Sequence, residues 1–124
     1  MLNDVTRRFT SPRGDVITAL RHIDMTIEKG EFVCIVGPTG CGKSTTLNLI
    51  TGLARPSEGT VQLNGAPVHG IDPGVGFVFQ TDALFPWGSV LDNVSAGPRF
   101  RGMSKKQAYA KARDWIARVG LSRF

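Results

Sequence analysis

Two hydrophobic patterns divide the chain into regions. Near the N-terminus, apolar residues alternate with polar ones, as at Ile23, Met25 and Ile27. Such alternation is typical of an antiparallel strand with one face in the core. The runs 32–36 and 75–79 are apolar without alternation. They predict strands buried on both faces of a parallel sheet.

Turn residues separate the strands of the alternating region. The cluster Ser-Pro-Arg-Gly-Asp at 11–15 lies between apolar runs, and Asn64-Gly65 is a dipeptide typical of a two-residue hairpin. We therefore expect an antiparallel β subdomain that spans about residues 1–30 and 59–68.

Helical spacing follows the first non-alternating run. Leu47 and Ile50 lie three residues apart in the segment 45–51, and Gly52 occupies the position of a helix C-cap. A short helix is predicted after this run, which makes the order strand, glycine-rich loop, helix.

Two further helices are predicted closer to the C-terminus. Ser89 is placed to cap a short helix that Gly97-Pro98 should end. Ser104 and Gln107 form a capping box, and helical spacing continues from there to Gly120. Because no aromatic residues interleave with the basic face of the last helix, we expect that face to be solvated and not to bind nucleic acid.

The loop between the first apolar run and its helix matches G-x-x-x-x-G-K-[ST], the phosphate-binding loop. Its glycines let the backbone approach phosphate oxygens, and the helix start adds free N–H groups and the positive end of the dipole. Lys43 supplies a charge for the outer phosphates, and Ser44 a hydroxyl ligand for Mg²⁺. The sequence predicts a nucleoside triphosphate site formed by Gly37, Pro38, Thr39, Gly40, Cys41, Gly42, Lys43 and Ser44.

Composition sets outer limits on the class of protein. The chain has 124 residues, 41% of them hydrophobic and 20% charged, which fits one small globular domain and excludes a disordered protein. No apolar run approaches the roughly twenty residues that cross a bilayer, and no secretory signal is recognisable, so a soluble or peripheral cytosolic protein is expected. Cys34 and Cys41 lack metal-ligand spacing and are expected to be reduced. The net charge of +5 suits an anionic ligand, nucleic acid or a membrane surface equally.

Two features stay open when only the residues are considered. Gln80 follows the second apolar run, where open α/β sheets place ligands, but a surface polar residue is an equally good interpretation. The loop 81–87 contains Leu84, Phe85, Pro86 and Trp87. It could form a partner surface or pack beneath the domain's own core.

In combination, these stretches resemble the ATPase subunit of an ATP-binding cassette (ABC) transporter, from its start to just before its midpoint. The resemblance rests on residues 5–9, 37–45, 52–59, 76–80 and 84–87. The Phe-Pro-Trp loop and the stretch after it look most like importers of nitrate, sulfonate and taurine. The resemblance implies an α/β fold: a phosphate-loop NTPase core over about 31–56 and 75–80, an N-terminal antiparallel β subdomain, and the start of a helical region over 81–124. It implies one partial domain over 1–124, incomplete at the C-terminus.

The resemblance also implies roles for individual residues. Phe9 matches the aromatic residue that stacks on adenine, at a position more often occupied by tyrosine. Thr45 completes the phosphate loop. Gln80 matches the glutamine that approaches Mg²⁺ and the attacking water, so Lys43 and Gln80 are the catalytic candidates, and Ser44 and Gln80 the metal ligands.

The resemblance implies the function of an ATP-binding subunit of an importer, which couples ATP binding and hydrolysis to uptake of a small anionic solute of the nitrate, sulfonate or taurine kind. The implied cofactors are ATP and Mg²⁺. Expected partners are the transmembrane permease, a second ATPase subunit and a solute-binding protein, without nucleic acid. The permease should meet the loop around Phe85 and Trp87. The subunit would lie peripherally on the cytoplasmic face of the cell membrane.

The later parts of the family's pattern have no counterpart in these residues: the signature, the catalytic glutamate and the switch histidine. Neither His22 nor His69 is placed to replace that histidine. We interpret the chain as the N-terminal part of a longer cassette and expect weak nucleotide binding with negligible hydrolysis by the chain alone. A non-catalytic fragment or interaction module is the alternative. A small phosphate-loop kinase fits poorly, because acceptor-site and lid residues are not recognisable.

Overall fold

The computed structural model describes residues 1–123 and divides the chain into two compact units, Met1–Phe77 and Val78–Phe124. The last position of the predicted domain, Phe124, lies outside the described residues. The first unit contains a sheet and one helix, and the second contains two helices. The single domain predicted over 1–124 stays a prediction.

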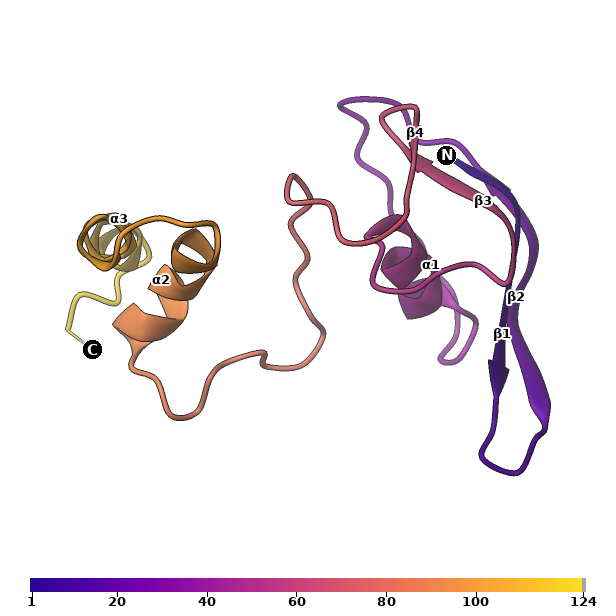
Figure 1. Ribbon diagram of the computed structural model, residues 1–124, viewed down its shortest axis with the longest axis horizontal. Helices are drawn as coiled ribbons and strands as arrows, with labels where there is room; N and C mark the ends of the chain where they lie inside the picture. Colours follow the sequence, from indigo (N-terminus) through magenta and orange to yellow (C-terminus); the bar gives the residue numbers. More distant parts are fainter. Residues whose placement is uncertain (124) are drawn as a thin grey trace. The chain divides into compact units, whose positions relative to one another are not determined.

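The sheet of the first unit confirms the predicted antiparallel strands (Figure 1). The strands are β1 Leu2–Thr10, β2 Val16–Met25, β3 Glu58–Leu63 and β4 Ala66–Pro67. Neighbouring strands all pair antiparallel, in the order β2-β1-β3-β4. At the predicted hairpin, Asn64 and Gly65 both adopt positive φ, 51° and 79°, as the two central residues of a type I′ turn do.

Bulges interrupt the pairing of β1 with β2. Asp4 and His22 lie in opposite strands and both have positive φ, 49° and 50°. The Asp4 carboxylate is 2.6 Å from Nδ1 of His22, and the His22 amide donates to the hydroxyl of Thr6 at 3.2 Å. Because of this shift, Leu2 and Val5 are both buried although they lie three residues apart.

The core of the first unit lies between the sheet and helix α1, Lys43–Ile50. Its buried members come from three strands and the helix: Leu2, Val5, Leu20, Leu49 and Val61. The helix ends one residue before the predicted position: Thr51 is the C-cap, and Gly52 follows it in the left-handed conformation with φ 75°. A Cβ there would come within 2.0 Å of the Gly70 carbonyl oxygen, so glycine also permits the segment after β4 to pass against the helix end.

The two buried parallel strands expected at 32–36 and 75–79 are not formed. Phe32 is 94% exposed and Val36 83%, and Cys34 is exposed as well, where burial was expected. A strand buried on both faces needs neighbouring strands and covering helices. The described residues form a single four-stranded antiparallel sheet, which leaves neither run inside a parallel one.

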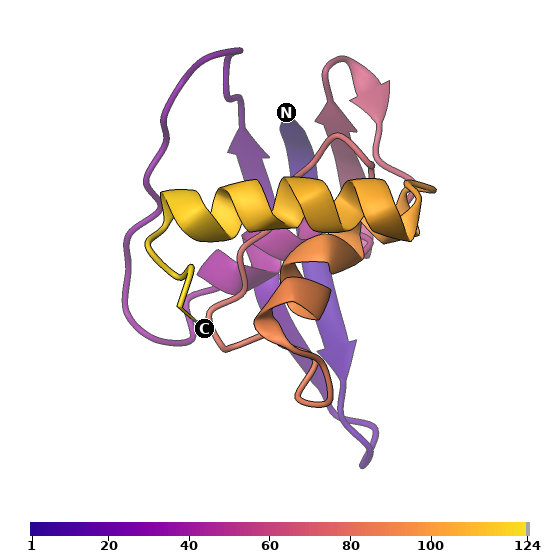
Figure 2. The same ribbon diagram turned by 90° about the vertical axis from the view of Figure 1, so that its left-hand side faces the viewer.

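The second unit consists of α2, Val90–Phe100, and α3, Lys105–Arg118, which pack against each other (Figure 2). The Ser89 cap is confirmed as a full capping box with Asp92. The predicted stop at Gly97-Pro98 is wrong, because α2 continues through Pro98. A proline ring disfavours helical conformation in the preceding residue partly by colliding with its Cβ, and Gly97 has none. The main-chain N–H groups of Arg101 and Met103 still donate to Gly97 and Pro98.

The predicted start and end of α3 are confirmed, and its apolar face in part. Ser104 accepts from the Gln107 amide at 3.4 Å and Gly120 has φ 76°, although the return bond of a capping box is replaced by a hydroxyl-to-amide contact. Ala108, Ala112 and Ile116 are buried. Trp115 is 58% exposed and Val119 65%.

No helix in the described part of the chain has the length and apolar character needed to span a bilayer.

Candidate nucleotide-binding site

The phosphate loop ends where α1 begins, and its last glycine lies against β2. Gly42 is the N-cap of α1, with a left-handed backbone of φ 96°. A Cβ at this position would lie 2.5 Å from Cδ2 of Leu20 and 2.9 Å from the carbonyl oxygen of Ala19. Glycine is required here for two reasons, the positive φ and the close approach to β2. The close approach places the start of the helix directly against the strand.

The rest of the loop curls back on itself. A Cβ on Gly37 would come within 2.7 Å of Sγ of Cys41, and Gly40 has φ 84° with no atoms near its missing side chain. The Cys41 amide donates to the carbonyl of Pro38 at 3.4 Å. The loop therefore offers mostly main chain at its surface, which is the form in which backbone N–H groups can reach phosphate oxygens.

Lys43 closes this curl. Its Nζ donates to the carbonyl oxygens of Gly37 at 2.8 Å and Pro38 at 2.7 Å, and lies 3.6 Å from Sγ of Cys41. The ammonium group is thus held at the loop by main-chain acceptors, and no carboxylate is among the partners found for it in the described residues. Such a cation can exchange neutral carbonyl oxygens for charged phosphate oxygens without breaking an ion pair.

The first turn of α1 fits an anion. No side chain caps the helix start, and the first turn contains no acidic residue. The Gly42 carbonyl accepts from the Thr46 amide at 2.8 Å, the first bond of the helix, and from the Thr46 hydroxyl at 3.0 Å, and neither contact occupies a free N–H group. The free N–H groups and dipole end therefore meet no competing carboxylate.

Ser44 is exposed in this first turn, with Thr45 half-buried beside it. A hydroxyl is a hard oxygen donor of the kind Mg²⁺ accepts, and Mg²⁺ commonly takes few protein ligands together with substrate phosphates. The described residues contain no cluster of three or more His, Cys, Asp or Glu side chains suited to a metal. The donor set therefore fits a magnesium ion that is bound with a nucleotide, and it does not fit an all-protein metal cage.

Phe9 lies near the end of β1 with 43% of its surface exposed. It is the strand partner of Ile17, which precedes Ala19 by two residues, or about 7 Å along β2. Since Ala19 borders Gly42, β2 connects the predicted adenine-stacking ring to the phosphate loop. One face of the ring is covered by the guanidinium of Arg7, 4.6 Å from the ring centroid.

Gln80 is an exposed residue at the start of the second unit. The structure therefore brings together Phe9 and the loop 37–45 within one unit, whereas the pairing of Gln80 with Lys43 stays a prediction. Gln80 also does not follow a formed strand, in contrast to the expectation from the run before it.

The loop 81–87 of the second unit, called the aromatic loop below, is exposed and is held in shape by hydrogen bonds. Trp87 is 83% exposed and Phe85 38%, and the Phe85 ring lies 5.6 Å from that of Trp87 and 6.3 Å from that of Phe100. Asn93 fixes the loop: its Oδ1 accepts from the Phe85 amide at 2.7 Å, and its Nδ2 donates to the carbonyls of Phe85 and Gly88 at 3.2 and 3.1 Å. Within this unit the side chains do not pack under a core. They border a hollow of about 420 Å³ together with Gly88, Asp92, Ala96 and Arg99.

Asp92 joins the two helices at this hollow. Its carboxylate accepts from the Ser89 hydroxyl at 2.6 Å and from the hydroxyl of Tyr109 on α3. These two hydrogen bonds, the Ser89 bond first, lower the pKa of Asp92 to about 2. The carboxylate is therefore ionised at neutral pH and ties α2 to α3.

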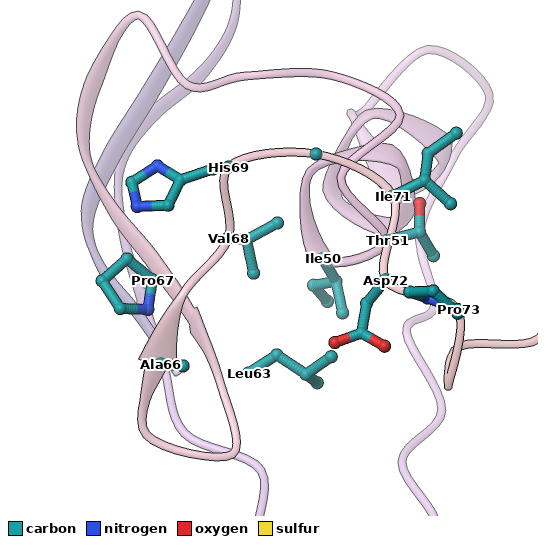
Figure 3. Close-up of a pocket in the computed structure, with 11 residues that line it drawn as sticks. Ile50, Thr51, Leu63, Ala66, Pro67, Val68, His69, Ile71, Asp72 and Pro73 are labelled. Atoms are coloured by element: carbon teal, nitrogen blue, oxygen red, sulfur yellow. The ribbon is translucent and has the colours of Figure 1, made fainter.

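A separate pocket of about 280 Å³ lies at the C-terminal end of α1, away from the phosphate loop (Figure 3). Ile50 of the helix, Leu63 of β3 and Asp72 surround it. Because it adjoins the last turn of α1, where the dipole is negative, this pocket does not belong to the anion site.

Sequence reasoning missed three residues that shape these features: Arg7, Asn93 and Phe100. Arg7 could have been found from its position two residues before Phe9, which places both on one face of a strand. The bonds of Asn93 run back five to eight residues into an irregular loop, and no periodic pattern indicates such contacts.

The order and geometry of these parts are those of a protein with a phosphate-binding loop. The sequence pattern of the ABC transporter family matches residues 20–124. The chain therefore belongs to the ABC transporter family.

Curated relatives narrow the comparison. The chain is 40% identical over 123 residues to the taurine import ATP-binding protein TauB of Jannaschia sp., covering 99% of this chain and 46% of that protein. It is 45% identical over 123 residues to the nitrate import ATP-binding protein NrtD of Synechocystis sp., with the same coverage of 99% and 46%. The chain spans about half the length of the curated relatives it matches.

Solved structures confirm the fold class. The chain matches a dimeric ATP-binding cassette, MJ0796, in a post-hydrolysis state bound to ADP and phosphate, with a TM-score of 0.80 and 33% identity. The match covers 94% of this chain and 55% of that one. The predicted α/β fold with an N-terminal antiparallel subdomain is thus that of the cassette, although its parallel strands are not formed among the described residues.

Proposed function

We propose that the chain provides the ATP-binding half of an importer's ATPase subunit, which couples ATP binding and hydrolysis to uptake of a small anionic solute of the taurine or nitrate kind. The observation that carries this proposal is the phosphate loop itself: a glycine-rich curl on β2, closed by Lys43, that leads into a helix start without acidic residues. The names of the relatives, taurine and nitrate import ATP-binding proteins, support the solute class.

In this proposal, Phe9 stacks on the adenine and the backbone of 37–45 binds the phosphates. Lys43 exchanges its bonds to Gly37 and Pro38 for oxygens of the outer phosphates. Ser44 holds Mg²⁺, which neutralises charge on the phosphates when bound. The half-exposed ring of Phe9 and the exposed hydroxyl of Ser44 are both accessible for these roles.

Hydrolysis needs more groups than these residues supply. Phosphoryl transfer depends on a positioned water, a bound metal and stabilisation of the equatorial oxygens. Gln80 would orient the water and share the metal with Ser44, but a residue that could act as the base has not been identified in this sequence. We therefore infer that the chain alone binds ATP and hydrolyses it at a negligible rate.

The proposed partners follow from surface and family. The exposed rings of Phe85 and Trp87, held in place by Asn93, would contact the transmembrane permease. The subunit would then lie on the cytoplasmic face of the membrane. The matched cassette is dimeric, which supports a second ATPase subunit as a partner. A solute-binding protein would deliver the solute, and no role for nucleic acid is proposed.

Thermal melting with increasing Mg-ATP tests the proposal. We expect the melting temperature of the purified protein to rise with nucleotide, because a ligand that binds only the folded state stabilises it. Lys43→Ala should abolish the rise, and Lys29→Ala, which removes an exposed lysine outside the loop, should preserve it.

The same experiment distinguishes the alternative function. A non-catalytic interaction module that retains the loop without using it would melt at one temperature at every Mg-ATP concentration. Measurable ATP turnover by the chain, abolished by Lys43→Ala, would instead contradict the inference of negligible hydrolysis.

A further inference from the structure

We propose that Arg7 is a positioning residue that sets the ring of Phe9 for adenine stacking. This inference rests on the nucleotide function proposed above and extends it to a residue to which the family resemblance assigns no role. Arg7 and Phe9 lie two residues apart in β1, so their side chains leave the strand on the same face. The guanidinium carbon of Arg7 lies 4.6 Å from the centroid of the Phe9 ring.

The Arg7 side chain is anchored from a second direction. Its Nη1 donates to the carbonyl oxygen of Arg55 at 2.9 Å, in the segment that follows α1. Its Nε is buried and has no hydrogen-bond partner in the described residues. The guanidinium is therefore held by one main-chain hydrogen bond and by its contact with the ring. In this position its buried Nε has no hydrogen-bond partner, which is uncommon for a buried polar atom.

This anchoring has a consequence for the ring. With the guanidinium on one face of Phe9, the other face is the one available to a base, and rotation of the ring would break the contact. The strand partner of Arg7 is Leu20, and Leu20 also borders Gly42 at the start of α1. The ring and the phosphate loop are therefore positioned from neighbouring points of the same hairpin.

The next residue along β1 provides a matched control. Arg8 is bonded to the carboxylate of Glu58 on β3 at 2.6 Å. Its main-chain amide donates to the Ser57 hydroxyl at 3.0 Å and takes no part in the contact between Arg7 and the ring. Removing Arg8 takes away the same charge from the same strand and leaves the Arg7–Phe9 pair intact.

The experiment compares a ligand that has a base with one that lacks it. Calorimetric titration of the purified protein with Mg-ATP and with Mg-tripolyphosphate gives a ratio of the two dissociation constants for each variant. Loss of an arginine's positive charge weakens the binding of both ligands, so this effect cancels in the ratio of dissociation constants. Loss of base stacking weakens the binding of ATP alone. We expect Arg7→Met to reduce the preference for ATP about two- to five-fold. Arg8→Met should leave the preference unchanged.

Two further variants separate positioning from a general structural role. Arg7→Lys retains a cation near the ring and should recover part of the preference. In a Phe9→Ala background, Arg7→Met should have no further effect on the ratio, because the ring on which Arg7 acts is absent.

The outcomes are distinct. If the wild-type protein prefers ATP and Arg7→Met keeps that preference, or loses affinity for both ligands equally, the inference about Arg7 is overturned and the proposed function stands. If the wild-type protein binds ATP no better than tripolyphosphate, the role of Phe9 in the proposed function fails and the inference about Arg7 fails with it.

Discussion

The ammonium nitrogen of Lys43 lies 2.7 Å from the carbonyl oxygen of Pro38, five residues earlier in the same loop. Together with the 2.8 Å bond to Gly37, this contact folds the lysine back over the loop from which it would reach phosphate. The two acceptors are neutral, so an incoming phosphate would replace them with negatively charged oxygens, which attract the ammonium group more strongly. The Lys43 ammonium group is thus already held at the loop, and it could exchange these carbonyl oxygens for those of a bound phosphate.

The loop glycines should differ in how far they tolerate a side chain. We expect Gly42→Ala to lower the free energy of unfolding by at least about 2 kcal/mol, because positive φ and overpacking against Leu20 and Ala19 add together. Gly40→Ala has the strain of φ 84° without the collision and should cost about 1–2 kcal/mol. Urea unfolding of both variants provides the comparison, and equal losses would contradict the close contact at Gly42.

Asp92 should make the second unit sensitive to acid. Its pKa is about 2 in the folded protein against an ordinary value of 3.8, so its contribution to stability is present above about pH 4 and is lost as the pH falls towards 2. The stability difference between the wild-type protein and Asp92→Asn should therefore shrink over this range, measured by denaturant unfolding at several pH values. Tyr109→Phe removes one of the bonds and should move the pKa of Asp92 part of the way back up. A difference that is independent of pH would contradict the assignment.

Asn93 should maintain the shape of the aromatic loop. Asn93→Asp retains an acceptor for the Phe85 amide but loses the donor to the carbonyls of Phe85 and Gly88, a loss of about 1 kcal/mol or more. In a Trp115→Phe background the fluorescence anisotropy of Trp87 should fall, because the loop that carries it is held less firmly. An unchanged Trp87 anisotropy would show that the loop keeps its shape without these bonds.

The exposed run 32–36 should promote self-association. Phe32 is 94% exposed in an apolar stretch, which favours contacts between copies of the chain. Phe32→Lys should reduce light scattering at high protein concentration. Thr26→Lys adds the same charge at another exposed position and should reduce scattering much less. Equal effects of the two variants would assign the result to net charge.

The sequence predicts elements well where their stability is local. The antiparallel strands, the Asn64-Gly65 turn and the caps at Ser89 and Ser104 are present, since alternation, turn residues and capping side chains act within a few residues. The runs 32–36 and 75–79 depend on neighbouring strands, which a periodicity argument cannot supply, and they are not strands here.

The candidate site divides in the same way. The phosphate loop is readable from glycine spacing because each glycine has a local reason: Gly40 and Gly42 have positive φ, and Gly37 lies close to Cys41. Two contacts of the site join residues that are far apart in sequence, so spacing alone does not reveal them. One is the packing of the loop against Ala19 and Leu20, and the other is the hydrogen bond from Arg7 to Arg55. The position of Gln80 after an apolar run left a ligand site and a surface residue equally open, and the specific role that the family resemblance implies for it stays a prediction.

The close approach of Gly42 to β2 has a consequence for motion. Because the helix start lies on Ala19 and Leu20 without room for a Cβ, local opening of the β1–β2 hairpin must disturb the phosphate loop as well. A nucleotide that binds only the intact loop would oppose that opening. Amide protons of Val16–Met25 should then exchange with solvent more slowly in its presence, so the hairpin would report on occupancy of the loop.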